Sequence, residues 1–122
     1  MSAPKRPRVL FVEDETALRT SYQRYFDRQY DMAFAGNGNE ALRCLDDFGP
    51  DVLVLDMRLP DTDGIALLQR IRRSRPALPV VVTSAYESME PLMTVLDLAH
   101  TAYLVKPFDL TELARCIDAA SG

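Results

Sequence analysis

A chain of 122 residues has the length of one domain and can bury about two-thirds of the surface that its unfolded form exposes. Its hydrophobic content of 48% and charged content of 26% are ordinary for a globular protein, and a net charge of −4 argues against direct binding of nucleic acid, which requires a basic face. It shows neither a signal peptide nor an apolar run long enough to cross a bilayer, so we expect a cytoplasmic protein without membrane contact.

Apolar runs alternate with amphipathic segments along the whole chain. The expected strands are residues 8–12, 30–34, 52–55, 79–82 and 103–105, and the expected helices are residues 16–28, 40–49, 65–74, 88–99 and 110–119. Continuous apolar runs are typical of interior parallel strands, whereas the alternating run at 30–34 indicates an edge. The strict alternation predicts a doubly wound α/β fold, with a five-stranded parallel sheet covered by five helices. Residues 1–7 would form an N-terminal tail and residues 8–122 the folded domain.

Reactive side chains follow four of the five expected strands. Glu13 and Asp14 come after the first strand, Asp56 after the third, Thr83 after the fourth and Lys106 after the fifth. The carboxyl ends of parallel strands share one edge of the sheet, where open α/β sheets bind ligands. This edge would collect three carboxylates, a hydroxyl and an ammonium. That set suits a divalent cation and a phosphoryl group, and not a hydrolase triad.

Each of these residues also has an ordinary structural interpretation. Asp56 is ionised at neutral pH and can act as a nucleophile without a general base, but it can equally cap a turn. Glu13 and Asp14 would repel each other unless a cation joined them, and oxygen ligands favour Mg²⁺, but acids also favour the first turn of a helix. Lys106 is restricted by the following Pro107, which would direct it at the acids, but it can also be a surface lysine.

Charge counting makes the set more persuasive than its members. Glu13, Asp14 and Asp56 carry three negative charges, which one Mg²⁺ and Lys106 would cancel. Phosphorylation of Asp56 would replace one negative charge by roughly two. The metal, the ammonium and the Thr83 hydroxyl could meet that extra charge, and in-line phosphoryl transfer needs little else.

In this order, the acidic pair, the strand-ending Asp, the Thr and the Lys106-Pro107-Phe108 motif resemble the receiver domain of two-component response regulators. The resemblance runs from Arg8 to Ala119. It implies a flavodoxin-like fold with strand order 2-1-3-4-5. It also implies a phosphorelay protein whose phosphoryl donor is a phosphohistidine on a sensor histidine kinase or a phosphotransfer protein.

The resemblance assigns a role to each site residue. Asp56 would accept the phosphoryl group, by self-catalysed transfer and with slow autodephosphorylation rather than as a conventional enzyme. Mg²⁺ would be bound by Asp56, by the backbone carbonyl of Arg58, and by Glu13 or Asp14. Of the acidic pair, Asp14 matches the member that usually coordinates directly.

The same resemblance predicts the switch. Lys106 would pair with the phosphoryl group, and Thr83 would shift to bond it. Tyr103 would be the coupled aromatic switch, and Pro107 would follow a cis peptide bond. The fourth helix, the last strand and the last helix would form the output surface.

Some positions depart from the family pattern or vary within it. Arg58 and Ala85 flank the phosphoryl site, and we predict that they set the lifetime of the acyl phosphate; Arg58 would either shield the phosphoryl group or be solvated. The expected helix at 88–99 is apolar over most of its circumference, which indicates either a partner or homodimer contact or simply a well-buried helix. It lacks a Gly at its end, and His100 is expected to be a structural surface residue.

Three other functions compete with a phosphorylatable receiver. A phosphorylation-independent docking or dimerisation module would usually lack one of the key residues. An aspartyl phosphatase of the haloacid dehalogenase type would carry a second Asp where this chain has Arg58. A flavodoxin-like cofactor binder would have a Ser/Thr/Gly-rich loop after the first strand, where this chain has acids.

Overall fold

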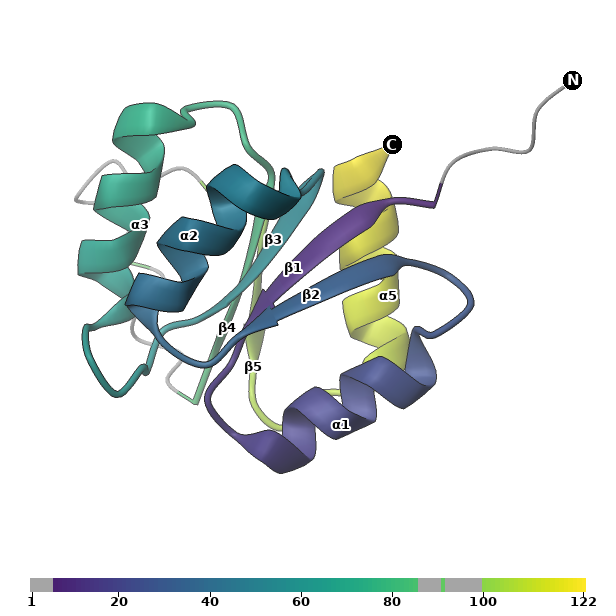
Figure 1. The fold of residues 1–122 in the computed structure, drawn as a ribbon. Coiled ribbons are helices and arrows are strands. Elements are labelled where there is room, and N and C mark those ends of the chain that lie inside the picture. Colours follow the sequence, from purple (N-terminus) through teal and green to yellow (C-terminus); the bar gives the residue numbers. More distant parts are fainter. Residues whose placement is uncertain (1–5, 86–90, 92–99) are drawn as a thin grey trace, which may run out of the picture.

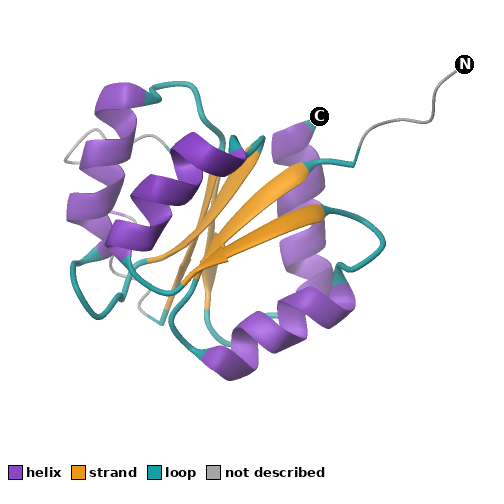
Figure 2. Ribbon diagram, in the orientation of Figure 1, coloured by secondary structure: helices purple, strands orange, loops and turns teal. Residues whose placement is uncertain are grey.

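A parallel five-stranded sheet with helices on both faces forms the described part of the chain, which is residues 6–85, 91 and 100–122 of a computed structural model (Figures 1 and 2). The strands are β1 (Arg8–Val12), β2 (Asp31–Ala35), β3 (Val52–Asp56), β4 (Val80–Ser84) and β5 (Ala102–Val105). The helices are α1 (Thr16–Tyr25), α2 (Gly38–Phe48), α3 (Gly64–Ser74) and α5 (Leu110–Ser121). Most of the expected helix over residues 88–99 lies outside the described residues.

The strand order is β2-β1-β3-β4-β5 and every pairing is parallel, which confirms the predicted doubly wound fold. β2 is an edge strand, as its alternating sequence predicts, and β3 lies in the middle. All five residues of β3 and of β4 are buried, because helices cover both faces of the sheet. None of the described helices is long and apolar enough to cross a membrane.

The sheet separates two apolar cores. On one face α2 and α3 pack over β1, β3 and β4, with Leu45, Leu67 and Ile71 fully covered. On the other face α1 and α5 pack over the same strands, and Phe11 stacks on Tyr22 with ring centroids 5.1 Å apart. This two-sided packing holds the strands in place, so the ends of β1 and β3 are fixed relative to each other.

The ends of several elements differ from the expected ones. The helix expected over 16–28 ends at Tyr25, because Phe26 and Tyr30 turn inward and their rings pack at a tilt with centroids 5.0 Å apart. The strand expected over 79–82 runs from Val80 to Ser84, so Thr83 lies within it. The side chain of Asn37 caps α2, and Gly49 ends that helix in the left-handed conformation.

Candidate functional site

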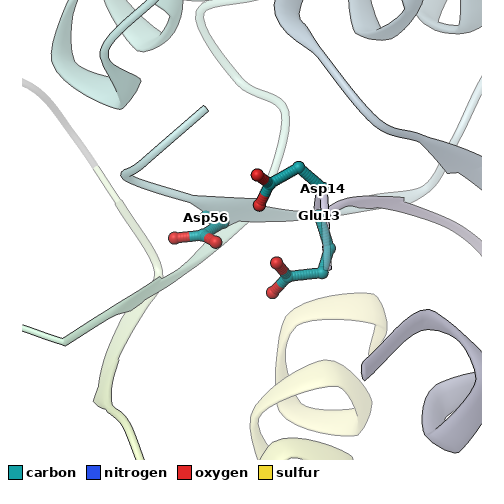
Figure 3. Close-up of side chains that lie close together, drawn as sticks. All are labelled: Glu13, Asp14 and Asp56. Carbon is teal, nitrogen blue, oxygen red and sulfur yellow. The ribbon is translucent and has the colours of Figure 1, made fainter. Parts of the chain in front are cut away.

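Three carboxylates converge at the carboxyl edge of the sheet. Glu13 and Asp14 directly follow β1, and Asp56 is the last residue of the neighbouring β3, so the sheet itself brings them together. Figure 3 shows the three side chains close together, and one carboxylate oxygen from each lies within 4.8 Å of the other two. Glu13 and Asp56 are buried at 2% and 5% exposure, whereas Asp14 is exposed.

Lys106 joins two of these acids. Its Nζ donates hydrogen bonds to Glu13 Oε1 at 2.9 Å and to Asp56 Oδ2 at 3.0 Å. Its backbone N–H donates to the carbonyl of Ser84 at 2.7 Å, and the Lys106–Pro107 peptide bond is cis. The predicted direction of the ammonium and the cis bond are therefore both present, and the surface-lysine interpretation is wrong.

Asp56 is held on both of its oxygens. Oδ1 accepts a hydrogen bond from the N–H of Arg58 at 3.1 Å, while Oδ2 faces Lys106. The next residue, Met57, donates its N–H to the carbonyl of Thr83 at 3.0 Å. The turn-capping interpretation thus holds for one oxygen only, and the other remains paired with a cation at the sheet edge.

The acids do not serve mainly as caps of α1. The residue before this helix is Glu15, whose side chain makes no capping hydrogen bond, and the first turn of α1 contains no acid. Glu13 accepts one hydrogen bond from the N–H of Glu15 at 3.2 Å through Oε2. Its other oxygen, Oε1, accepts the hydrogen bond from Lys106, so the main charge partner of Glu13 lies in the site.

The crowding of charge perturbs the ionisation of the site. The pKa of Glu13 is raised to about 7, chiefly by burial; the hydrogen bond from Lys106 partly opposes the rise, and the nearby Asp56 adds to it. Burial alone would lower the pKa of Lys106, but its hydrogen bonds to Glu13 and Asp56 outweigh that cost and hold the pKa above its usual value. In the absence of a metal, the cluster therefore keeps the ammonium charged and tends to protonate Glu13.

These side chains border an open cavity of about 370 Å³. The described residues lining it are Glu13, Asp14, Glu15, Asp56, Met57, Arg58, Ser84, Ala85 and Lys106. The polar groups that line it are mainly hard oxygens, the ligands that Mg²⁺ prefers. The donor set and the space together fit a small hydrated cation beside a phosphoryl-sized anion.

The other predicted residues, Thr83, Tyr103 and Pro107, are not among the described residues that line this cavity. Thr83 is opposite Asp56 in the β3–β4 register and is 1% exposed, but it makes no hydrogen bond with Asp56 or Lys106. Tyr103 is half-buried in β5, and its ring lies edge-on to that of His100 with centroids 6.2 Å apart. Pro107 is exposed and borders a second, mostly apolar cavity of about 360 Å³ that includes Tyr22 and Phe108.

Several cavity residues were not singled out from the sequence. Ser84 and Met57 line the cavity, while Thr83 is not among the described residues that do. Ser84 directly follows Thr83 in the chain, and its hydroxyl is the feature by which the sequence could have indicated a site residue. Which of two neighbouring hydroxyls borders the cavity depends on the pleat of the strand, which the sequence alone does not determine.

Comparison with known proteins agrees with this geometry. The family model of the response regulator receiver domain matches residues 9–118. The transcriptional regulatory protein TrcR of Mycobacterium tuberculosis is 40% identical over 107 residues, which cover 87% of this chain and 42% of TrcR. The regulatory protein AtoC of Escherichia coli is 35% identical over 93% of this chain and 25% of AtoC. The chain thus spans less than half the length of these curated relatives.

Solved structures show the same fold. The receiver domain of a Francisella response regulator superposes with a TM-score of 0.85 at 31% identity, covering 94% of this chain and 96% of that one. The response regulator TrrA of Thermotoga maritima, solved in complex with Mg²⁺-BeF, superposes with a TM-score of 0.83 at 25% identity, covering 93% and 98%. Together with the match over residues 9–118, these likenesses show that the chain belongs to the receiver domains of two-component response regulators.

Proposed function

We propose that this receiver accepts a phosphoryl group on Asp56 from a phosphohistidine of a sensor histidine kinase or phosphotransfer protein in the cytoplasm. The observation that carries the proposal is the pairing of Asp56 Oδ2 with the Lys106 ammonium at 3.0 Å, beside two further carboxylates and an open cavity. The acceptor is thus positioned beside a cation and borders open space.

In the proposed transfer, one oxygen of Asp56 attacks phosphorus. The new O–P bond forms as the N–P bond of the phosphohistidine breaks, and the imidazole leaves with the electron pair. The Lys106 ammonium, already placed between Glu13 and Asp56, stays within reach of the added charge. A bound Mg²⁺ would supply the remaining positive charge.

The proposed Mg²⁺ ligands are the carboxylates of Asp14, Asp56 and Glu13 and the backbone carbonyl of Arg58. Support comes from the 4.8 Å clustering of the three acids and from the position of Arg58 on the cavity wall. The TrrA structure, solved with Mg²⁺-BeF, is a fold relative in which such a complex forms.

Switching is the second half of the proposal. Thr83, Tyr103 and Pro107 would rearrange on phosphorylation and alter an output surface formed by the segment at 88–99, β5 and α5, with a homodimer as one outcome. Nearly complete switching requires a bias of about 5.5 kcal/mol, so partial shifts are expected unless a partner adds binding energy. The segment at 88–99 lies almost wholly outside the described residues, so the support rests on the half-buried Tyr103 of β5.

Arg58 and Ala85 are proposed to set the lifetime of the acyl phosphate, because both line the cavity beside Asp56. Arg58 is exposed, and its guanidinium can fold over an added phosphoryl group or remain in solvent. Replacing Arg58 by Ala and following the loss of the phosphoryl group decides between these, since shielding predicts faster autodephosphorylation. An unchanged rate would mean that the side chain is solvated.

The test is incubation with Mg²⁺ and acetyl phosphate, followed by intact-protein mass measurement. The wild-type protein should gain one phosphoryl group, and Asp56→Asn should gain none. No gain by the wild-type protein at generous donor concentration would leave the alternative, a phosphorylation-independent docking module.

Sedimentation with and without the donor tests the homodimer, and a monomer in both states would rule out the homodimer. The boundary at residue 8, the N-terminal tail at 1–7 and the absence of direct nucleic-acid binding remain predictions.

A further inference from the structure

The loop between β3 and α3, residues 57–63, is tied down at both ends. At its start, the N–H of Arg58 donates to Asp56 Oδ1, and Arg58 forms an isolated antiparallel bridge with Asp63. At its end, the N–H of Gly64 donates to the carbonyl of Met57 at 2.7 Å. These contacts close the loop, while the N–H of Met57 joins its start to β4 and the buried side chains of Met57 and Leu59 pack into the core.

Asp61, in the middle of this loop, joins it to the start of α2. Its Oδ1 accepts a hydrogen bond from the N–H of Gly38 at 2.7 Å, and its Oδ2 accepts one from the N–H of Asn39 at 3.1 Å. Gly38 and Asn39 are the first two residues of α2, so the carboxylate occupies the positive end of that helix. These hydrogen bonds, chiefly the one from Gly38, lower the pKa of Asp61, so it stays ionised at neutral pH.

The contact leaves little free space. A Cβ on Gly38 would lie 2.7 Å from Cγ2 of Thr62 and 3.3 Å from Asp61 Oδ1. At the closed end of the loop, a Cβ on Gly64 would lie 2.4 Å from the Cα of Met57. Backbone therefore approaches backbone at Gly64, whereas at Gly38 the backbone of α2 meets the side chains of Thr62 and Asp61, so the loop packs closely against α2.

We propose that Asp61 is a positioning residue for the cation site, which it serves by holding the loop that carries Arg58 against α2. This rests on the proposed function, in which the carbonyl of Arg58 is a metal ligand. Arg58 lies three residues from Asp61 on the same closed loop, so loss of the Asp61 contact lets the loop, and the Arg58 carbonyl with it, shift relative to α2. Outer contacts of this kind orient metal ligands in proteins generally.

The chain supplies a matched control. Asn37 caps the same end of α2 by accepting the N–H of Glu40 at 2.9 Å, and it makes no hydrogen bond to the loop. Asn37→Ala and Asp61→Ala both weaken the start of α2, but only the second removes the hydrogen bonds between the loop and α2. A merely structural role predicts the same behaviour from both variants, and a positioning role separates them.

Two measurements on the whole chain distinguish the two variants. Titration calorimetry with Mg²⁺ alone should show binding about tenfold weaker in Asp61→Ala than in the wild-type protein, at the lower end of what losing an outer contact costs. Asn37→Ala should bind as the wild-type protein does. Amide hydrogen exchange without metal should be faster at Arg58 and Gly64 in Asp61→Ala only. Asp61→Asn, whose amide oxygen can still accept one N–H, should fall between.

The charge of Asp61 needs a separate check. Repeating the titration at about 0.1 M and about 1 M NaCl screens through-space attraction, whereas loss of a contact persists at both salt concentrations. Equal Mg²⁺ affinity of Asp61→Ala and the wild-type protein, or a difference that vanishes at high salt, would overturn the inference. Failure of the wild-type protein to bind Mg²⁺ would instead remove the metal from the proposed function. The amide hydrogen exchange of Arg58 and Gly64 would still test whether Asp61 holds the loop against α2.

Discussion

Replacing Glu13 by Gln should abolish a pH dependence of stability that the wild-type protein has without metal. The pKa of Glu13 is about 7 in the folded protein and 4.5 ordinarily. Below 4.5 both states hold the proton; between 4.5 and 7 only the folded state does. The stability that protonated Glu13 contributes is therefore fully present at low pH and is lost as the pH rises through 7. At about 1.4 kcal/mol for each pKa unit, the free energy of unfolding falls by up to about 3 kcal/mol.

The assay is urea unfolding, followed by circular dichroism with a chelator present, at about pH 5 and about pH 8. Other groups titrate equally in the wild-type protein and in Glu13→Gln, so the difference between the two pH dependences isolates Glu13. Adding Mg²⁺ should restore stability mainly at the higher pH, because the metal binds the ionised carboxylate.

Glu15→Gln is the control for charge, since it removes one acid two residues away whose side chain is exposed and makes no capping hydrogen bond. It should keep the wild-type pH dependence. If the wild-type protein and Glu13→Gln lose stability in parallel as the pH rises, Glu13 is not the buried acid that the geometry indicates, and the electrostatic account of the site is wrong.

Three further substitutions test individual contacts by urea unfolding. Lys106→Met should cost about 2 kcal/mol near pH 8, because it leaves two buried carboxylates without their cation, and clearly less near pH 5; equal costs at both values would argue against the pairing. Gly64→Ala should cost about 2 kcal/mol, because its Cβ would overlap the Cα of Met57, and a neutral effect would show that the loop has slack. Gly49→Ala should cost only about 1 kcal/mol, since its Cβ meets nothing and only the left-handed backbone (φ 64°) penalises it; a larger loss would point to a contact not seen here.

The sequence predicts the sheet and the meeting of its acids because both follow from patterns that are local. Runs such as Val52–Leu55 are apolar throughout and bounded by turn residues, so they have few alternatives to buried strands. Once those strands are parallel, Glu13 and Asp56 must lie at one edge, and the structure places them there. The backbone of Lys106 is likewise restricted by the proline that follows it in the chain.

Features that depend on packing between distant segments could not be predicted. Nothing local ends the helical pattern after Tyr25; the chain turns there because Phe26 packs on Phe11, with ring centroids 5.9 Å apart. Similarly, the sequence around Asp61 predicts only an ordinary acid in a loop. The packing of α2 and α3 on the same face of the sheet brings Asp61 to Gly38. The pleat decides that Ser84, and not Thr83, borders the cavity.

The strand that ends in Asp56 is hydrogen-bonded along both of its sides, to β1 and to β4. Such a strand cannot slide to make room for a bulkier residue 56, because a slip by one residue would turn every side chain to the opposite face. Its amides should exchange only when the whole domain unfolds. Any adjustment to a covalently enlarged side chain is therefore left to the segments around the strand end, so the central sheet stays fixed while those segments move relative to it.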